Sequence, residues 1–176
     1  AHRRNIFCAL FVPQSGDTKA VTCALDRMVH LVDLTTEQST KLATCSQFCC
    51  KLAFVPGSPS CFLSAALNGA VSLFDLREDP ARRRRLLLNL SEQGGSTTGL
   101  AFDPTSDGLH FVVGADDPFI RAYDLRKVRS RASAEPVHMY VPQGLASQPR
   151  TVDEGCSSGA SSLAFSRVGR LLVNMR

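Results

Sequence analysis

Leu52-Ala53-Phe54 and Leu100-Ala101-Phe102 are two of four copies of one short apolar motif, and the other two are Ala9-Leu10-Phe11 and Leu163-Ala164-Phe165. The four phenylalanines are 43, 48 and 63 residues apart. A pattern that returns roughly every 40 to 50 residues indicates one supersecondary unit repeated along the chain. We therefore expect the same strands in the same order in each repeat, with connections of different length.

The apolar runs follow the same order in each of the first three repeats. The motif is followed by a second apolar run and then by a third that ends in Asp-Leu, as Val32-Asp33-Leu34, Phe74-Asp75-Leu76 and Tyr123-Asp124-Leu125. Asn68-Gly69 between two such runs is a strong signal for a two-residue hairpin. Weaker strand candidates at 40–46, 85–90 and 137–141 supply a fourth, outer strand. Runs that are apolar at successive positions need cover on both faces, which the neighbouring blades of a β-propeller provide.

The prediction is therefore an all-β fold, a partial β-propeller with three four-stranded blades and the start of a fourth. The repeats cover about 2–46, 47–90, 96–141 and 160–176, and a Ser/Gly/Pro-rich loop fills 142–160. Closed propellers have about four to eight blades, so this one is not closed. The apolar run of the fourth repeat reaches Val173, and Asn174-Met175-Arg176 after it does not continue like a blade. This ending and the missing initiator Met suggest a fragment. A terminal blade left uncovered exposes an apolar face and an open strand edge, so we expect poor solubility or association of the isolated chain.

Composition narrows the class of protein. The 176 residues are 44% hydrophobic and 20% charged, and no apolar stretch approaches the roughly 18 residues that cross a membrane. The start of the chain does not resemble a secretory signal. Seven cysteines are an odd number for a disulfide framework, so we expect a reducing compartment, the nucleus or the cytoplasm. A net charge of +4 is too small to indicate nucleic-acid binding.

These repeats resemble the WD-repeat family of β-propellers over residues 2–173. The chain departs from the family pattern in having no Trp, because Val32, Phe74 and Tyr123 stand where the signature Trp would be. Only His2 could be the His that usually precedes a repeat. The acidic residue of the tight turn is kept as Asp26 and Asp117, with Asn68 in the middle repeat. The resemblance implies the architecture, with a weakened internal hydrogen-bond network.

Two successive repeats carry a narrower resemblance. Phe74-Asp75-Leu76-Arg77 and Tyr123-Asp124-Leu125-Arg126 each look like the WDxR box of the family, which implies docking to the DDB adaptor of cullin-4 ubiquitin ligases. The early repeats also look like the DDB- and cullin-4-associated factors related to the WD and tetratricopeptide repeat proteins. The resemblance makes six residues the candidate adaptor-binding site: Phe74, Asp75, Arg77, Tyr123, Asp124 and Arg126. Val32-Asp33-Leu34-Thr35 lacks the aromatic residue and the Arg, so it receives no adaptor contact.

The leading hypothesis is a substrate receptor of a cullin-4 RING E3 ubiquitin ligase, with an unknown substrate bound elsewhere. An Arg just past a strand projects from the blade rim, where its planar fork can grip carboxylates or carbonyls. Such arginines can also be ordinary solvated hairpin ends. The alternative is therefore a general scaffold for signalling or chromatin complexes. Neither hypothesis requires an enzyme, a cofactor or a membrane.

Other motifs have simpler explanations. The run Arg82 to Arg85 is either a nuclear-import, phosphate or RNA patch or a solvated inter-blade loop, and the lack of nearby aromatics favours the loop. Gly155-Cys156-Ser157-Ser158-Gly159 matches G-x-S-x-G but lacks the strand and helix of a nucleophile elbow. Cys45, Cys49 and Cys50 have no second ligand set at zinc-like spacing, so no metal site is expected.

Overall fold

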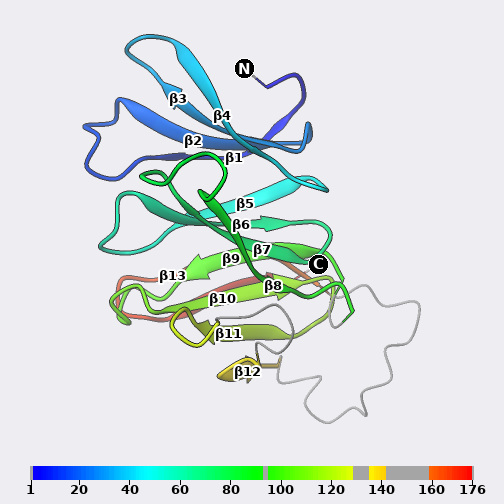
Figure 1. Cartoon of the computed structure of the whole chain (residues 1–176). Helices are drawn as coiled ribbons and strands as arrows, with labels where there is room; N and C mark the ends of the chain where they lie inside the picture. Colours follow the sequence, from blue (N-terminus) through cyan, green and yellow to red (C-terminus); the bar gives the residue numbers. More distant parts are fainter. Residues whose placement is uncertain (1, 93–94, 129–134, 142–158, 176) are drawn as a thin grey trace.

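The computed structural model describes residues 2–92, 95–128, 135–141 and 159–175. All helices and strands assigned in these residues are β-strands. Neighbouring strands along the chain pair into antiparallel sheets (Figure 1). The all-β prediction is confirmed. Much of the predicted loop at 142–160, including most of the G-x-S-x-G motif, lies outside the described residues.

Three sheets have four strands each, and each sheet is one blade. Blade 1 consists of β1 (Ile6–Phe11), β2 (Lys19–Ala24), β3 (Met28–Asp33) and β4 (Gln38–Thr44). Blade 2 consists of β5 (Cys49–Phe54), β6 (Cys61–Ala66), β7 (Ala70–Asp75) and β8 (Arg84–Asn89). Blade 3 consists of β9 (Thr97–Phe102), β10 (His110–Ala115), β11 (Ile120–Asp124) and β12 (His138–Tyr140). The partial blade 4 has β13 (Ala160–Phe165) and β14 (Leu171–Met175).

The end of the chain corrects one expectation. The apolar run of the fourth repeat was followed only to Val173, but β14 continues to Met175, because Ser162 pairs with Asn174 and Ala160 pairs with Met175. Met175 also packs against the apolar cluster between blades 3 and 4. Pairing with the preceding strand and this apolar cover therefore extend β14 further than the residue types alone suggested.

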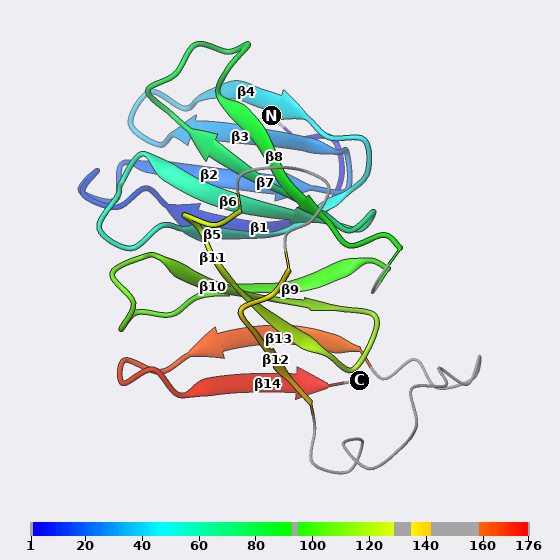
Figure 2. The ribbon, with the colours of Figure 1, turned by 60° about the horizontal axis from the view of Figure 1, so that its bottom comes forward.

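The blades are stacked face to face, and the core consists of the layers between them (Figure 2). In blade 2, Phe62 and Phe74 belong to the layer shared with blade 1, and their rings stack at 4.8 Å with 6° between their planes. The adjacent Leu63 belongs to the layer shared with blade 3. Successive strand residues point to opposite faces, so a sheet covered on both sides must be apolar at neighbouring positions.

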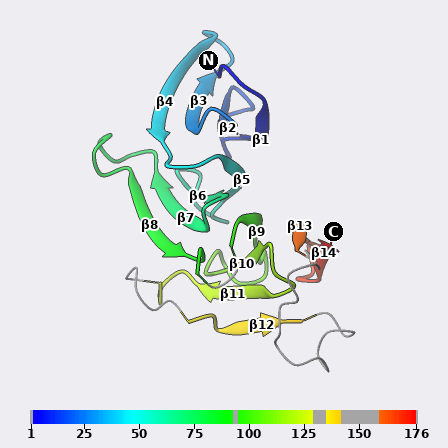
Figure 3. The ribbon, with the colours of Figure 1, turned by 90° about the vertical axis from the view of Figure 1, so that its right-hand side faces the viewer.

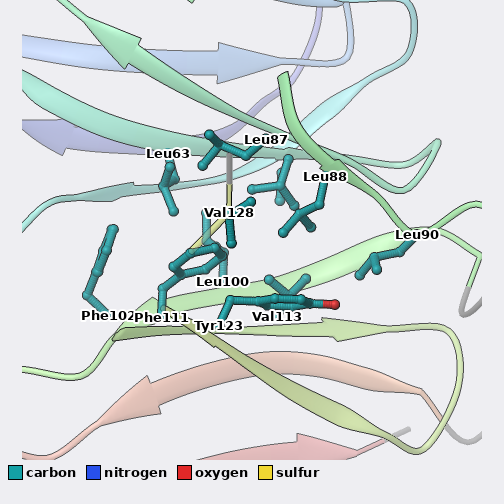
Figure 4. Close-up of a cluster of buried hydrophobic side chains, with 12 residues drawn as sticks. Leu63, Leu87, Leu88, Leu90, Leu100, Phe102, Phe111, Val113, Tyr123 and Val128 are labelled. Atoms are coloured by element: carbon teal, nitrogen blue, oxygen red, sulfur yellow. The ribbon is translucent and has the colours of Figure 1, made fainter. Parts of the chain in front are cut away.

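Figure 4 shows the layer between blades 2 and 3. The ring of Tyr123 from β11 lies below Leu87 and Leu88 from β8, and Phe111 lies beside it. Farther along the stack, Gly99 and Gly114 let blade 4 approach blade 3 closely. A Cβ atom on Gly99 would lie 2.6 Å from Leu163, and one on Gly114 would lie 2.7 Å from Ala160. Small residues at these positions therefore set the spacing of this interface.

The internal hydrogen-bond network survives in blade 1. His2 Nδ1 lies 3.0 Å from Asp26 in the β2–β3 turn, and His2 Nε2 lies 2.9 Å from the hydroxyl of Thr22. In blade 3, Asp117 occupies the equivalent turn position and pairs with the guanidinium of Arg121 instead. The same acidic turn residue is thus held by a His in one blade and by an Arg in another.

Candidate protein-docking site

The two candidate boxes lie at the same rim of neighbouring blades. Each follows the third strand of its blade, β7 or β11. The backbone N–H of Leu76 donates to Ser60 at 2.9 Å, and that of Leu125 donates to Leu109 at 2.7 Å, so the same bond closes both hairpins. The neighbouring turns touch, because a Cβ atom on Gly108 of blade 3 would lie 2.6 Å from the carbonyl oxygen of Pro56 in blade 2. The fold therefore places both boxes on one side of the stack.

In the second-repeat box (Phe74 to Arg77), Arg77 folds back onto Asp75. Its Nε donates to Oδ1 at 3.0 Å and its Nη2 donates to Oδ2 at 2.8 Å, a two-pronged pair of planar groups. The backbone N–H of Arg77 donates to the same Oδ1 at 3.0 Å. The Arg77 side chain is nevertheless 70% exposed. Asp75 thus fixes the direction of a guanidinium that remains accessible to a partner.

The third-repeat box (Tyr123 to Arg126) repeats this geometry. Arg126 Nε donates to Asp124 Oδ1 at 3.1 Å, and Nη2 donates to Oδ2 at 2.7 Å. The backbone N–H of Arg126 lies 2.9 Å from Oδ1. The Asp124 side chain is only 3% exposed, whereas that of Arg126 is 61% exposed. Two neighbouring blades therefore present the same preorganised cation at equivalent positions.

The electrostatics of the two boxes agree with this pairing. The side-chain hydrogen bond from Arg77 lowers the pKa of Asp75 to about 2. The equivalent bond from Arg126 holds the pKa of Asp124 well below its usual range. The hydrogen bonds to Asp75 and Asp124 in turn raise the pKa of each guanidinium. Both carboxylates and both arginines are fully ionised near neutral pH.

The first repeat uses a hydroxyl where the other two use an Arg. The hydroxyl of Thr35 donates to Asp33 Oδ1 at 2.6 Å, and the backbone N–H of Thr35 donates to the same oxygen at 3.0 Å. The turn is therefore capped by Asp33 in the same way, but it presents no cation. This local turn chemistry makes Thr35 a natural internal control for the two arginines.

The two aromatic candidates lie inside the molecule. The exposed fraction of Phe74 is 0% and that of Tyr123 is 1%. Neither ring has surface to offer a partner in this structure. Their part in the site is to anchor the ends of β7 and β11 in the core, which positions Asp75 and Asp124. The expected cluster of six contact residues thus divides into exposed arginines, their supporting carboxylates and buried anchors.

Sequence reasoning missed one neighbour of each box. Cys61 pairs with Asp75 and His110 pairs with Asp124 across the second and third strands. His110 Nε2 lies 3.8 Å from Asp124 Oδ2, and Cys61 Sγ lies 4.0 Å from Arg77 Nη2. The antiparallel register could have revealed both, because each is the first residue of its strand opposite the last residue of the next.

The arginine run at 82–85 is divided between several environments. Arg84 is half-buried; its Nε donates to Ser72 at 3.2 Å and its Nη1 donates to the carbonyl of Thr44 in blade 1 at 3.1 Å. Arg82 and Arg85 are exposed. Arg84 therefore ties blade 2 to blade 1 and is not part of a continuous solvent-facing patch.

The described part of the chain offers little support for a metal site or a reactive thiol. Within these residues, no three His, Cys, Asp or Glu side chains are grouped so as to bind a metal ion. A helix of membrane-spanning length and apolarity is likewise not found there. Cys45 and Cys49 lie buried between blades 1 and 2, and burial raises the pKa of the Cys50 thiol to about 12. These thiols serve as small apolar core groups.

The repeated four-stranded sheets define a partial WD-repeat β-propeller. Comparison with known proteins supports this class: the chain is 33% identical over 133 residues to the human and mouse forms of WD and tetratricopeptide repeats protein 1. It is 29% identical over 143 residues to human DDB1- and CUL4-associated factor 6, and 29% identical over 190 residues to Protein ALTERED SEED GERMINATION 2 of Arabidopsis thaliana. No protein-family profile matches the chain.

The aligned regions cover most of this chain but little of these relatives. They amount to 73%, 75% and 85% of the chain, and to 19%, 16% and 25% of the respective relatives. The chain therefore spans about a fifth of the length of the first relatives it matches. It is related to these WD-repeat proteins, as its repeats indicated, and it aligns with only a part of each of them.

Proposed function

We propose that this chain is a protein-interaction scaffold that docks the DDB adaptor of a cullin-4 RING E3 ubiquitin ligase through Arg77 and Arg126. The observation that carries the proposal is the doubled Arg–Asp pair, with the same two-pronged geometry at equivalent positions of adjacent blades. Similarity to a protein named as associated with DDB1 and CUL4 supports it. In this role the whole protein would be a substrate receptor.

The chemistry of the pair suits docking. A guanidinium carries more N–H donors than one carboxylate can accept, and Asp75 engages Arg77 through Nε and Nη2. The remaining donors of Arg77 belong to a side chain that is 70% exposed. A partner carboxylate or carbonyl can bind there without reorienting the Arg, so little side-chain entropy is lost on binding.

Two anchors on neighbouring blades also make docking specific. Truncating an interface Arg of this kind can cost about 2 kcal/mol or more of binding free energy. A partner must match both arginines at the separation that the blade stack sets. A partner that reaches only one of them loses much of the binding energy. The spacing of blades 2 and 3 thereby becomes part of the recognition.

The test is recovery of the adaptor from cells with the tagged chain. The double variant Arg77→Ala, Arg126→Ala should lose co-purification of the DDB adaptor, because both exposed cations are gone. The matched control is Thr35→Ala, which truncates the equivalent residue of blade 1 and should leave recovery unchanged. Unaltered recovery by the double variant would discard the proposal.

The second candidate is a general scaffold for signalling or chromatin complexes. It is favoured by the fact that Arg77 and Arg126 already have partners within their own hairpins, as ordinary surface arginines do. This function predicts capture of other proteins without adaptor or cullin. The six free cysteines among the described residues support work in the nucleus or cytoplasm under either proposal.

A further inference from the structure

The first residue of the second strand lies beside the acidic residue of the Asp-Leu ending in each complete blade. The register pairs Lys19 with Asp33, Cys61 with Asp75 and His110 with Asp124. The acidic residue is therefore constant at this rim, whereas its neighbour is an amine in blade 1, a thiol in blade 2 and an imidazole in blade 3. The two candidate boxes thus share one Arg–Asp geometry and differ in the side chain next to it.

His110 stands within reach of a group bound at Arg126. Figure 3 shows β10 and β11 in the middle of blade 3, between β9 on the inner side and β12 on the outer side. At the rim, His110 Nε2 lies 3.8 Å from Asp124 Oδ2, and Arg126 Nη2 donates to the same oxygen at 2.7 Å. The side chain of His110 is 47% exposed and that of Arg126 is 61% exposed. One oxygen of a buried carboxylate is thus flanked by two exposed basic groups.

The rim is open to a partner even where a blade is covered on both faces. Blade 2 packs against blade 1 through one apolar layer and against blade 3 through another. Its Arg77 is still 70% exposed. Accessibility of the equivalent positions in blade 3 is therefore a property of the rim, since covering the faces of a blade leaves its box exposed.

Other titratable groups reach His110 from the neighbouring strands. Asp103, which follows β9, and His138 and Tyr140 of β12 line the same small cavity as His110. Asp103 is engaged within its own turn, because its Oδ1 accepts from the backbone N–H and the hydroxyl of Thr105 at 2.9 and 2.7 Å. His138 belongs to the outer strand of the blade, which makes it a second imidazole with which His110 can be compared.

The charges at this rim favour an anionic partner group. Asp124 attracts a proton onto His110, whereas the guanidinium of Arg126 opposes it, so the two nearest charges act in opposite directions. A partner carboxylate in front of Arg126 adds a negative charge beside the imidazole and favours its protonated form. By linkage, a partner that prefers protonated His110 binds more tightly as the pH falls through the range in which imidazole gains its charge.

We propose that His110 is a further contact residue of the third-repeat box, and that it binds one carboxylate of the adaptor together with Arg126. This inference rests on the proposed function. Two basic groups beside one oxygen select a carboxylate over a backbone carbonyl, because charge-assisted hydrogen bonds from both are the stronger ones. The second-repeat box has Cys61 at the equivalent position, so Arg77 acts there without a second basic group.

Biolayer interferometry of the 176-residue chain with purified DDB adaptor tests the proposal, at about pH 8 and about pH 6 and equal ionic strength. The measured quantity is the Kd at the higher pH divided by the Kd at the lower pH. His110→Asn should reduce this ratio about two- to fivefold, the size expected when an exposed ion pair is lost. His138→Asn is the matched control, because His138 lines the same cavity, and it should keep the wild-type ratio. Comparing variants cancels any pH dependence of the adaptor itself.

His110→Lys separates charge from shape. Lys19 occupies the equivalent position beside Asp33 in blade 1, so a lysine is compatible with this strand end. Because lysine stays protonated at both pH values, the variant should bind at the higher pH about as tightly as the wild type binds at the lower one. Its Kd ratio should equal that of His110→Asn.

The outcomes distinguish this inference from the proposed function. If Arg77→Ala, Arg126→Ala abolishes binding but His110→Asn keeps the wild-type ratio, or His138→Asn lowers it equally, His110 is not a contact and only this inference is overturned. If the wild-type chain does not bind the adaptor at either pH, or the double variant binds as well as the wild type, both fall. Circular dichroism establishes that the strands of each variant are intact, and His110→Gln replaces His110→Asn if the sheet is disturbed.

Discussion

Replacing Phe74 separates its role in the core from a role in binding. Its ring is fully buried and stacks on Phe62 at 4.8 Å. Phe74→Leu roughly conserves apolar volume, which usually costs under about 1.5 kcal/mol, and it removes an aromatic pair worth about 0.5 to 1.5 kcal/mol. The unfolding free energy should fall by about 2 kcal/mol. Phe74→Ala should cost about 3 to 5 kcal/mol, a large part of the roughly 5 to 15 kcal/mol that holds a domain folded.

Urea denaturation and thermal melting measure this loss. For a domain of this size, about 2 kcal/mol corresponds to a decrease in Tm of about 4 to 8 °C. Adaptor capture by Phe74→Leu should be unchanged below the melting range, because the ring only supports Asp75. The reasoning is refuted if Phe74→Leu keeps its stability but loses the adaptor, since the ring would then be a contact residue.

Three further expectations concern pH and backbone geometry. The folded pKa of Asp75, about 2, lies below its unfolded value, so the stability it contributes is present above about pH 4 and is lost as the pH falls toward 2; Arg77→Ala should flatten that part of a urea-monitored pH profile. Burial, aided by the charge of the neighbouring imidazole, lowers the pKa of His30. The stability that neutral His30 contributes is therefore lost as the pH falls below about 6.5. His30→Asn should remove this pH dependence of the unfolding free energy, measured between about pH 7 and 5. Gly108→Ala should cost about 2 to 4 kcal/mol in urea titrations, because φ is +77° and the new Cβ meets a carbonyl oxygen at 2.6 Å. Gly57→Ala, with φ +76° and open space, should cost only about 1 kcal/mol, and equal losses would contradict the clash.

The sequence was a good guide to the fold because a repeat reports the same local choice several times. Asn68-Gly69 marked the connection between β6 and β7, but the turn differs from the predicted two-residue hairpin: three residues, 67–69, join the strands, the N–H of Gly69 donates to the carbonyl of Ala66 at 3.0 Å, and of the pair only Gly69 has a positive φ, +78°. The apolar runs predicted the strands because sheets covered on both faces need apolar residues at successive positions. Strand ends were less certain: β14 runs two residues past Val173, because Asn174, a residue of low strand propensity, is held there by pairing with Ser162, and β12 is shorter than the predicted 137–141 strand.

The candidate site was only partly readable. The spacing of Asp75 and Arg77 identified the box, but it could not show that the two side chains form a two-pronged pair, since that depends on rotamers. The place of His110 beside Asp124 depends on strand register, which a single strand does not contain. Burial of Tyr123 was hidden for a related reason: an aromatic residue at a strand end can face either a neighbouring blade or solvent.

By itself, the sequence determined the identity and order of the strands, because hairpin signals and apolar runs are local properties of the chain. Tertiary structure alone decided which copies of a repeated position are buried. Phe11 and Phe102 occupy the same place in their repeats, yet one is 56% exposed and the other 8%, because only one has a preceding blade among the described residues. Burial is a property of what lies on the other side of a face, and no local pattern contains it.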